Sequence, residues 1–158
     1  MCAVHDREPT LHFDIFTTIP SWFFEDSLAG PFTCHEVVTD IGLIQETPLH
    51  ADFAETVKRL NRFIPFEKER IDQLARKVNR LKCGLVVCDI APMGIAVARR
   101  AGMASLLIEN FTWDWVYEEY QGTHGGLRRH ADYLGELFSR ADYLYRCNKN
   151  SNKIMSGG

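Results

Sequence analysis

The residues best suited to chemistry lie in one part of the chain, between Asp89 and Trp115. Asp89 follows the apolar run Leu85 to Cys88, which is rich in β-branched residues. A carboxylate in this position can accept a hydrogen bond from a ligand hydroxyl or remove its proton. It can equally cap the helix that Pro92 is expected to open. The sequence leaves both roles open.

The loop NFTWDW, which follows a second apolar run, carries side chains that suit a sugar. Trp113 and Trp115 flank Asp114, and an indole ring beside a carboxylate matches the apolar face and the hydroxyls of a sugar. We expect one tryptophan to point inward and the other to line a cleft. The side chains of Asn110 and Thr112 can also form hydrogen bonds with a ligand. Both residue types favour helix N-caps, however, and capping is the preferred interpretation. The candidate acceptor-binding residues are Asp89, Asn110, Thr112, Trp113, Asp114 and Trp115, and no catalytic residue is singled out.

Other groups of reactive residues are weaker candidates. Glu118 and Glu119 share the acidic stretch with Asp114, but acids at the first turn of a helix are explained by the helix dipole. Two sets contain residue types that bind metals: His124 and His130 with Cys147, and His5, His12 and His35 with Cys34. Neither set has the paired spacing of a structural zinc site, so we predict no metal and no other cofactor. A catalytic Cys-His pair would form only in space, and the sequence singles none out.

The elements around the candidate residues predict a βαβ unit. Leu85–Val87 and Ala104–Ile108 are expected to be strands covered on both faces, as in a parallel sheet. Pro92 suits the first turn of the helix between them, and Gly102 suits its end. Ligands of open α/β sheets bind beyond the carboxyl ends of the strands, which places Asp89 and the loop 109–115 at the candidate site.

The rest of the chain supplies further α/β elements. Strands are predicted at Leu11–Thr17, Cys34–Thr39 and Ala141–Arg146, a loop at Asp40–His50, and helices from Phe53 to Leu81 with a break at Pro65, and over Leu127–Phe138. Residues 1–10 are expected to be an unstructured lead-in and residues 147–158 a disordered tail.

The composition limits the function classes. With 158 residues, 46% hydrophobic and 25% charged, the chain is expected to form one soluble domain. The net charge is -3 and acids interleave with the bases, which argues against nucleic-acid binding. There is no bilayer-length apolar run and no signal-peptide pattern at the start, so a cytoplasmic location without an integral membrane segment is expected. Five irregularly spaced cysteines suggest reduced thiols.

Several well-known signatures are absent from the sequence. It contains no GxGxxG, no GxxxxGK[ST] and no GxSxG. The dinucleotide, P-loop and hydrolase interpretations therefore lack their motifs. A doubly wound domain normally opens with a strand, a glycine-rich turn and a helix, and nothing before Leu11 supplies them.

Several segments together resemble a known family. FTTIPSWFF, VVTDIGLIQ and LVVCDIAPMGIAVARRAGMASLLIENFTWDWVYEEY are similar to the N-terminal domain of GT-B-type glycosyltransferase-like proteins. They are also similar to the glycosyltransferase-like segment of plant L-arabinokinases. The match runs from about Leu11 to Tyr145, and DIAP followed by NFTWDW is its most specific part. The implied fold is the N-terminal half of GT-B, a Rossmann-like parallel sheet flanked by helices, here lacking its first strand-helix unit and truncated at both ends.

The resemblance implies that residues 11–146 are the acceptor-side domain of an enzyme that transfers a sugar from a nucleotide-sugar donor to an acceptor hydroxyl. The donor would be bound by a C-terminal domain that this sequence does not contain, so the chain is expected to be inactive alone. Two alternatives stay open. One is a non-catalytic module that binds a sugar or metabolite. The other is a regulatory or structural domain that pairs with a partner chain through an exposed sheet edge.

Overall fold

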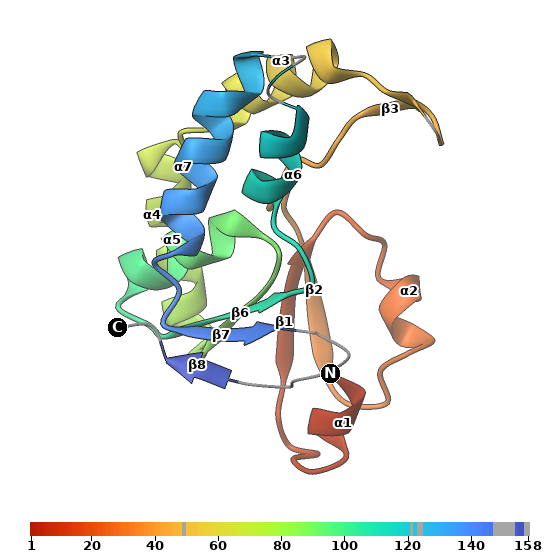
Figure 1. The fold of residues 1–158 in the computed structure, drawn as a ribbon. Helices are drawn as coiled ribbons and strands as arrows, with labels where there is room; N and C mark the ends of the chain where they lie inside the picture. Colours follow the sequence, from red (N-terminus) through yellow and green to blue (C-terminus); the bar gives the residue numbers. More distant parts are fainter. Residues whose placement is uncertain (49, 121, 123–124, 147–153, 157–158) are drawn as a thin grey trace. The chain divides into compact units, whose positions relative to one another are not determined.

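A computed structural model describes residues 1–48, 50–120, 122, 125–146 and 154–156 (Figure 1). The chain separates into two compact units, Met1–Thr39 and Asp40–Gly158, where the composition predicts one domain. Both units contain parallel strands together with helices. The predicted α/β, Rossmann-like fold class is therefore confirmed.

The first unit contains a pair of parallel strands. β1 (Phe13–Thr17) pairs with β2 (Phe32–Glu36), and α1 (Cys2–His5) and α2 (Trp22–Glu25) complete the unit. Both strands overlap their predicted ranges. The expectation of an unstructured lead-in is wrong for α1, because His5 is buried and its Nε2 lies 3.0 Å from the carbonyl oxygen of Leu11.

The second unit contains a four-stranded sheet in the order β5-β6-β7-β8. β5 (Val86–Asp89), β6 (Ser105–Glu109) and β7 (Tyr143–Arg146) are parallel, as predicted. β8 (Ile154–Ser156) pairs antiparallel with β7, so the expectation of a disordered tail is wrong for these three residues. The remainder of the predicted tail lies outside the described residues.

The helix of the βαβ unit has the predicted ends. α5 (Pro92–Ala101) carries proline in its first turn, where the missing N–H costs no helical hydrogen bond. Gly102 follows in the left-handed conformation with φ 68°, which a residue without a Cβ adopts at little cost. The residues at the two ends of α5 therefore determine where this helix begins and ends.

The segment before the βαβ unit forms two helices, as the break at Pro65 predicts. They are α3 (Phe53–Phe63) and α4 (Lys68–Arg80). The predicted loop 40–50 is interrupted by a short antiparallel pair, β3 (Gln45–Thr47) and β4 (His50–Ala51). That part of the loop prediction is wrong, since Gln45–Thr47 pairs with His50–Ala51.

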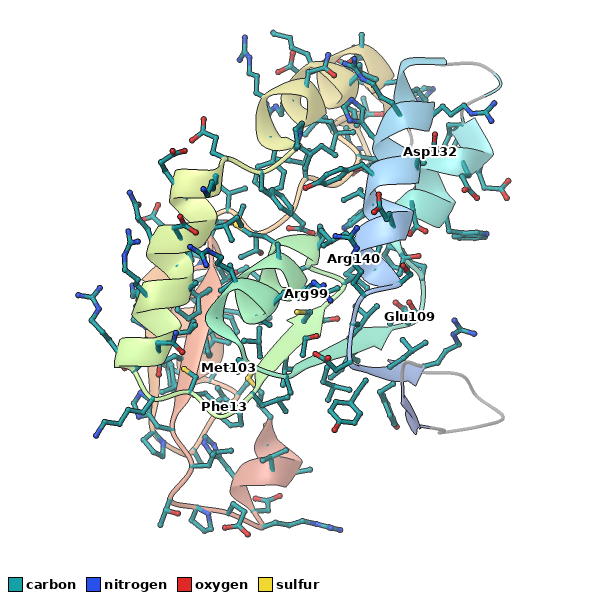
Figure 2. The ribbon with its side chains drawn as sticks, turned by 90° about the vertical axis from the view of Figure 1, so that its left-hand side faces the viewer. Phe13, Arg99, Met103, Glu109, Asp132 and Arg140 are labelled. Atoms are coloured by element: carbon teal, nitrogen blue, oxygen red, sulfur yellow. The ribbon has the colours of Figure 1, made fainter. Side chains whose placement is uncertain are left out.

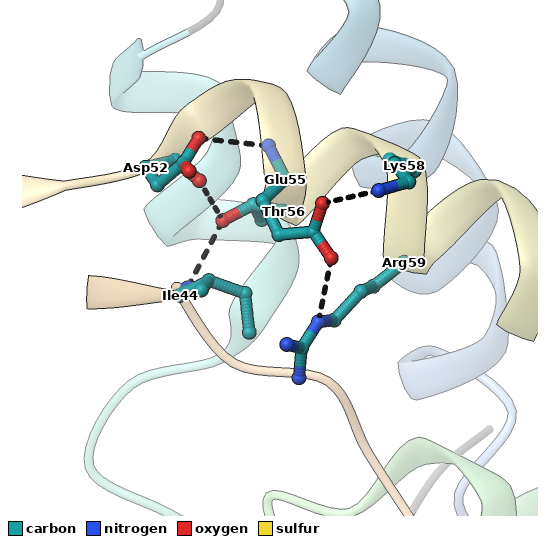
Figure 3. Close-up of polar contacts among 6 residues, drawn as sticks. All are labelled: Ile44, Asp52, Glu55, Thr56, Lys58 and Arg59. Atoms are coloured by element: carbon teal, nitrogen blue, oxygen red, sulfur yellow. Dashed lines mark hydrogen bonds and ion pairs between the residues drawn. The ribbon is translucent and has the colours of Figure 1, made fainter. Parts of the chain in front are cut away.

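Asp52 fixes the start of α3 (Figure 3). Its Oδ1 accepts a hydrogen bond from the Glu55 backbone N–H at 2.8 Å. The Thr56 hydroxyl donates to the Asp52 carbonyl at 2.6 Å and accepts the Ile44 N–H at 3.0 Å. The cap therefore ties the first turn of α3 to the segment that precedes β3.

Replacing Asp52 by alanine is expected to cost about 0.5–2 kcal/mol of unfolding free energy, because an N–H of the first turn loses its acceptor. Urea unfolding followed by circular dichroism measures the change. Glu67→Ala is the matched control, since Glu67 is exposed and occupies the N-cap of α4 without a side-chain cap bond. Equal costs for the two substitutions would contradict the capping role.

One face of the four-stranded sheet carries the core. In Figure 1 the helices α5, α6 (Trp113–Tyr120) and α7 (Arg128–Phe138) lie on the same side of β6–β8. A 3-10 turn, η1 (Gly125–Leu127), leads into α7. The buried core residues of this side are Leu60, Ile64, Cys88, Ile95, Leu107, Tyr117, Leu127, Ala131, Leu134, Leu137 and Phe138.

The opposite face of the same sheet is open. Val87 is 51% exposed and Tyr143 is 43% exposed, although both lie within strands. The prediction that the β5 strand is covered on both faces is therefore wrong. The helix α5 that connects β5 to β6 and the helix α7 that leads into β7 contact each other and share one core. Neither of these two helices covers the other face of the sheet.

Candidate functional site

The three parallel strands of the second unit each end in a charged residue. These residues are Asp89 on β5, Glu109 on β6 and Arg146 on β7. Figure 2 shows Glu109 at the end of its strand. Glu109 is buried; its Oε1 accepts a hydrogen bond from Arg146 Nε at 2.8 Å and forms an ion pair with Nη2 of the same guanidinium at 2.7 Å. Asp89 is exposed, so its carboxylate is the accessible one of the two.

The backbone turns sharply after Asp89. Ile90 has φ 47°, a conformation that a β-branched side chain rarely adopts. Its N–H donates to the Ile108 carbonyl at 3.2 Å, so the strained residue still belongs to the edge of the sheet. Strained residues of this kind persist where the surrounding structure holds them, and they cluster at functional sites.

A second carboxylate, that of Asp40, interacts with Asp89. Trp113 Nε1 donates to Asp40 Oδ2 at 3.0 Å. Burial raises the pKa of Asp40, the hydrogen bond from Trp113 partly offsets this rise, and the negative charge of Asp89 adds to it. The carboxyl edge of the sheet therefore holds two carboxylates. Asp89 is exposed, whereas Asp40 is half-buried and has a higher pKa than a free aspartate.

The position of Asp40 is fixed by aromatic packing. The Trp113 ring stacks on Tyr117, with centroids 6.0 Å apart, and meets Phe111 edge-on at 5.4 Å. A Cβ on Gly42 would lie 2.9 Å from the same ring, so only glycine allows this approach. Tyr117 is fully buried and donates its hydroxyl to the Ile41 carbonyl. Burial also raises the pKa of Tyr117, with the Asp40 charge as a smaller cause, so its hydroxyl stays protonated.

The other side chains of the NFTWDW loop point in different directions. Trp113, Asp114 and Trp115 are consecutive in α6, where successive residues are turned by about 100°. Asp114 faces α7, with Oδ2 only 3.1 Å from the position of a Cβ on Gly135, and its buried Oδ1 has no hydrogen-bond partner within the described part of the chain. Trp115 is 56% exposed. The three side chains therefore do not form one surface.

Asn110 and Thr112 lie between β6 and α6. Thr112 immediately precedes the helix, and its carbonyl accepts the Val116 N–H at 3.1 Å. Thr112 therefore occupies the N-cap position of α6, which threonine side chains favour. Asn110 is exposed and directly follows Glu109, so it lies at the carboxyl edge of the sheet.

The weaker candidates do not gather into a metal site. Among the residues that the structure describes, no group of three or more His, Cys, Asp or Glu side chains is arranged to hold a metal ion. Glu118 and Glu119 are exposed, and His124 and Cys147 lie outside the described residues. His130 is buried with its Nε2 at 2.8 Å from Asn61 Oδ1, and burial together with the Arg129 charge lowers its pKa. His130 therefore serves as a neutral packing residue.

Cys2, Cys34 and Cys88 are free thiols, and Cys88 lies in β5 directly before Asp89. Burial raises the pKa of Cys88 to about 12, so its thiol is not a nucleophile at neutral pH. None of the helices in the described part of the chain has the length and hydropathy of a membrane span.

Sequence reasoning missed Asp40, although a signal was present. Asp40 directly follows the predicted strand Cys34–Thr39, just as Asp89 follows the next apolar strand. The rule that selects Asp89 would also have selected Asp40, although the observed β2 ends at Glu36 and belongs to the separate sheet of the first unit. Its partner Trp113 is 73 positions away, so the hydrogen bond between them could not be found from local spacing.

Comparison with known proteins gives one relevant similarity. The chain is 26% identical over 135 residues to the L-arabinokinase of Arabidopsis thaliana, and the match covers 84% of this chain but 13% of the plant protein. The chain thus corresponds to a small part of the length of that protein. No protein-family model matches the chain, and no solved structure matches it.

Proposed function

We propose that residues 11–146 form the acceptor-binding domain of a sugar-transferring enzyme, with the acceptor held at the carboxyl edge beside Asp40 and Asp89. The observation that carries this proposal is the pair of neighbouring carboxylates, one exposed and the other fixed by Trp113. Carboxylates accept hydrogen bonds from hydroxyl groups, and parallel sheets bind ligands at this edge. The similarity to a protein named L-arabinokinase supports a carbohydrate as the ligand.

The proposed reaction transfers a sugar from a nucleotide-sugar donor to a hydroxyl of the acceptor. The acceptor oxygen forms a bond to the anomeric carbon, the bond from that carbon to the diphosphate breaks, and a base takes the hydroxyl proton. Asp89 is the proposed base, because it is the exposed carboxylate at the carboxyl edge of the sheet and immediately precedes the strained residue Ile90. Asp40 and Trp113 orient the acceptor for this step.

The chain is proposed to bind the acceptor without transferring a sugar to it by itself. Its sequence has none of the glycine-rich phosphate-binding motifs named above, so the diphosphate of the donor needs a second domain. Within the loop, Asn110 and Thr112 are the proposed additional contacts to the acceptor. Asp114 and Trp115 are turned away from Trp113 and are left out of the proposed site.

Calorimetric titration with L-arabinose, D-galactose and D-glucose tests the proposal. The unaltered chain is expected to bind at least one of these sugars, and Asp89→Asn is expected to weaken that binding about 10-fold, since a charge-assisted hydrogen bond is lost. Asp132→Asn is the matched control, because Asp132 is an exposed carboxylate on α7 (Figure 2). An equal loss in both variants, or no binding of any of the three sugars, would contradict the proposal.

A further inference from the structure

We propose that Asp40 determines the specificity of the acceptor site: its carboxylate, held by Trp113, accepts a hydrogen bond from a second hydroxyl of the acceptor and restricts the site to uncharged sugars. This inference rests on the proposed function and names the substrate class of the same site. A sugar phosphate is the relevant competitor, because sugars are commonly phosphorylated on a hydroxyl that an acceptor site would otherwise bind.

The first support is the distribution of charge at the carboxyl edge. Asp40 accepts a hydrogen bond from the neutral indole N–H of Trp113, and burial and the negative charge of Asp89 both raise its pKa. Glu109 already engages Arg146 through two nitrogens of the guanidinium. Within the described residues, neither Asp40 nor Asp89 forms an ion pair, so the edge repels an anion.

The second support is the geometry of Asp40. Its Oδ2 accepts the Trp113 N–H, whereas its Oδ1 makes no hydrogen bond among the described residues, and the residue is only half-buried. Oδ1 is therefore available as an acceptor, and the Trp113 hydrogen bond to Oδ2 holds the carboxylate in one orientation. The ring that orients it is held by Tyr117, Phe111 and the close approach of Gly42. A fixed acceptor binds a hydroxyl without first losing side-chain freedom.

The third support is the difference between the two carboxylates. Asp89 is exposed, whereas Asp40 is half-buried and is held by its hydrogen bond from Trp113. Two acceptors with these properties match two hydroxyls of one polyol, one of which reacts and one of which only positions the molecule. A phosphate in place of the second hydroxyl would bring its negative charge against a carboxylate that has no cationic partner.

The test compares L-arabinose, D-galactose and D-glucose with the 1-phosphates of the same sugars, by chemical-shift titration of the labelled chain at pH 7. The unaltered chain is expected to bind a neutral sugar at least 10-fold more tightly than its phosphate. Asp40→Asn is expected to weaken binding of the neutral sugar about 10-fold. It is also expected to reduce the ratio of the affinities for the neutral sugar and the sugar phosphate. The reason is that the amide oxygen can still accept the hydrogen bond from Trp113, while the negative charge is lost.

The outcomes separate the two proposals. Tight binding of a sugar phosphate, or unchanged binding of the neutral sugar in the Asp40→Asn variant, overturns the specificity role of Asp40 while the sugar-binding function stands. If neither class of compound shifts any resonance, the proposed function itself fails, and the specificity role fails with it. The amide spectrum of the variant, recorded without ligand, shows whether the fold is retained, and Asp132→Asn serves again as the control.

Discussion

Replacing Leu107 by alanine is expected to lower the free energy of unfolding by about 2–5 kcal/mol, the cost of a buried cavity. Leu107 is only 2% exposed and lies in β6, between β5 and β7. It belongs to the core shared with Ile95 of α5 and Leu134 of α7. Urea unfolding followed by circular dichroism measures the effect.

Val87→Ala is the matched control for the Leu107 substitution. Val87 lies in the neighbouring strand but on the opposite face of the sheet, since its register partner is Leu106, and it is 51% exposed. The change is expected to stay within about 0.5 kcal/mol. A cost for Val87→Ala as large as that for Leu107→Ala would mean that the sheet is covered on both faces in solution.

Trp113→Phe is expected to destabilise the chain by about 1–3 kcal/mol, because a half-buried carboxylate loses its hydrogen-bond donor. Phenylalanine keeps an aromatic ring against Tyr117 but has no N–H for Asp40. Trp115→Phe is the control, since Trp115 is 56% exposed, and its effect is expected to stay within about 0.5 kcal/mol.

The effect of Trp113→Phe should depend on pH. In the folded chain the indole hydrogen bond lowers the pKa of Asp40 and opposes the rise caused by burial. Its stabilisation is therefore fully present where Asp40 is ionised, and it is lost as the pH falls through the raised pKa of this carboxyl. Unfolding of both proteins at pH 7 and at pH 4 checks this. A loss of stability that is the same at both pH values would show that packing alone, not the Asp40 bond, is removed.

The parts of the fold that follow from local chemistry could be predicted from the sequence. Pro92 and Gly102 determine where α5 begins and ends, and Pro65 separates α3 from α4. Two apolar runs of strand length predicted β5 and β6 and their parallel pairing, and the structure confirms both. The placement of Asp89 at the carboxyl edge followed from the same reasoning.

The parts that depend on distant packing could not be predicted in this way. The Asp40–Trp113 bond joins residues 73 positions apart, and the direction of Asp114 depends on its contact with Gly135 of α7. The open face of β5 results from helices that all pack on one side, which an apolar strand sequence does not reveal. The pairing of β8 with β7 also depends on a tertiary contact, because the polar segment around β8 has no strand pattern of its own.

The central claim is that a neutral sugar binds at the carboxyl edge beside Asp40 and Asp89. Its most direct test is a titration of the isotopically labelled chain with L-arabinose, D-galactose and D-glucose, monitored residue by residue through the backbone amides. The predicted result with at least one sugar is saturable shifts confined to residues 40–42, 89–91 and 110–113, weakened by Asp89→Asn. The absence of saturable shifts with all three sugars, or shifts centred on α7 around Asp132, would contradict the account.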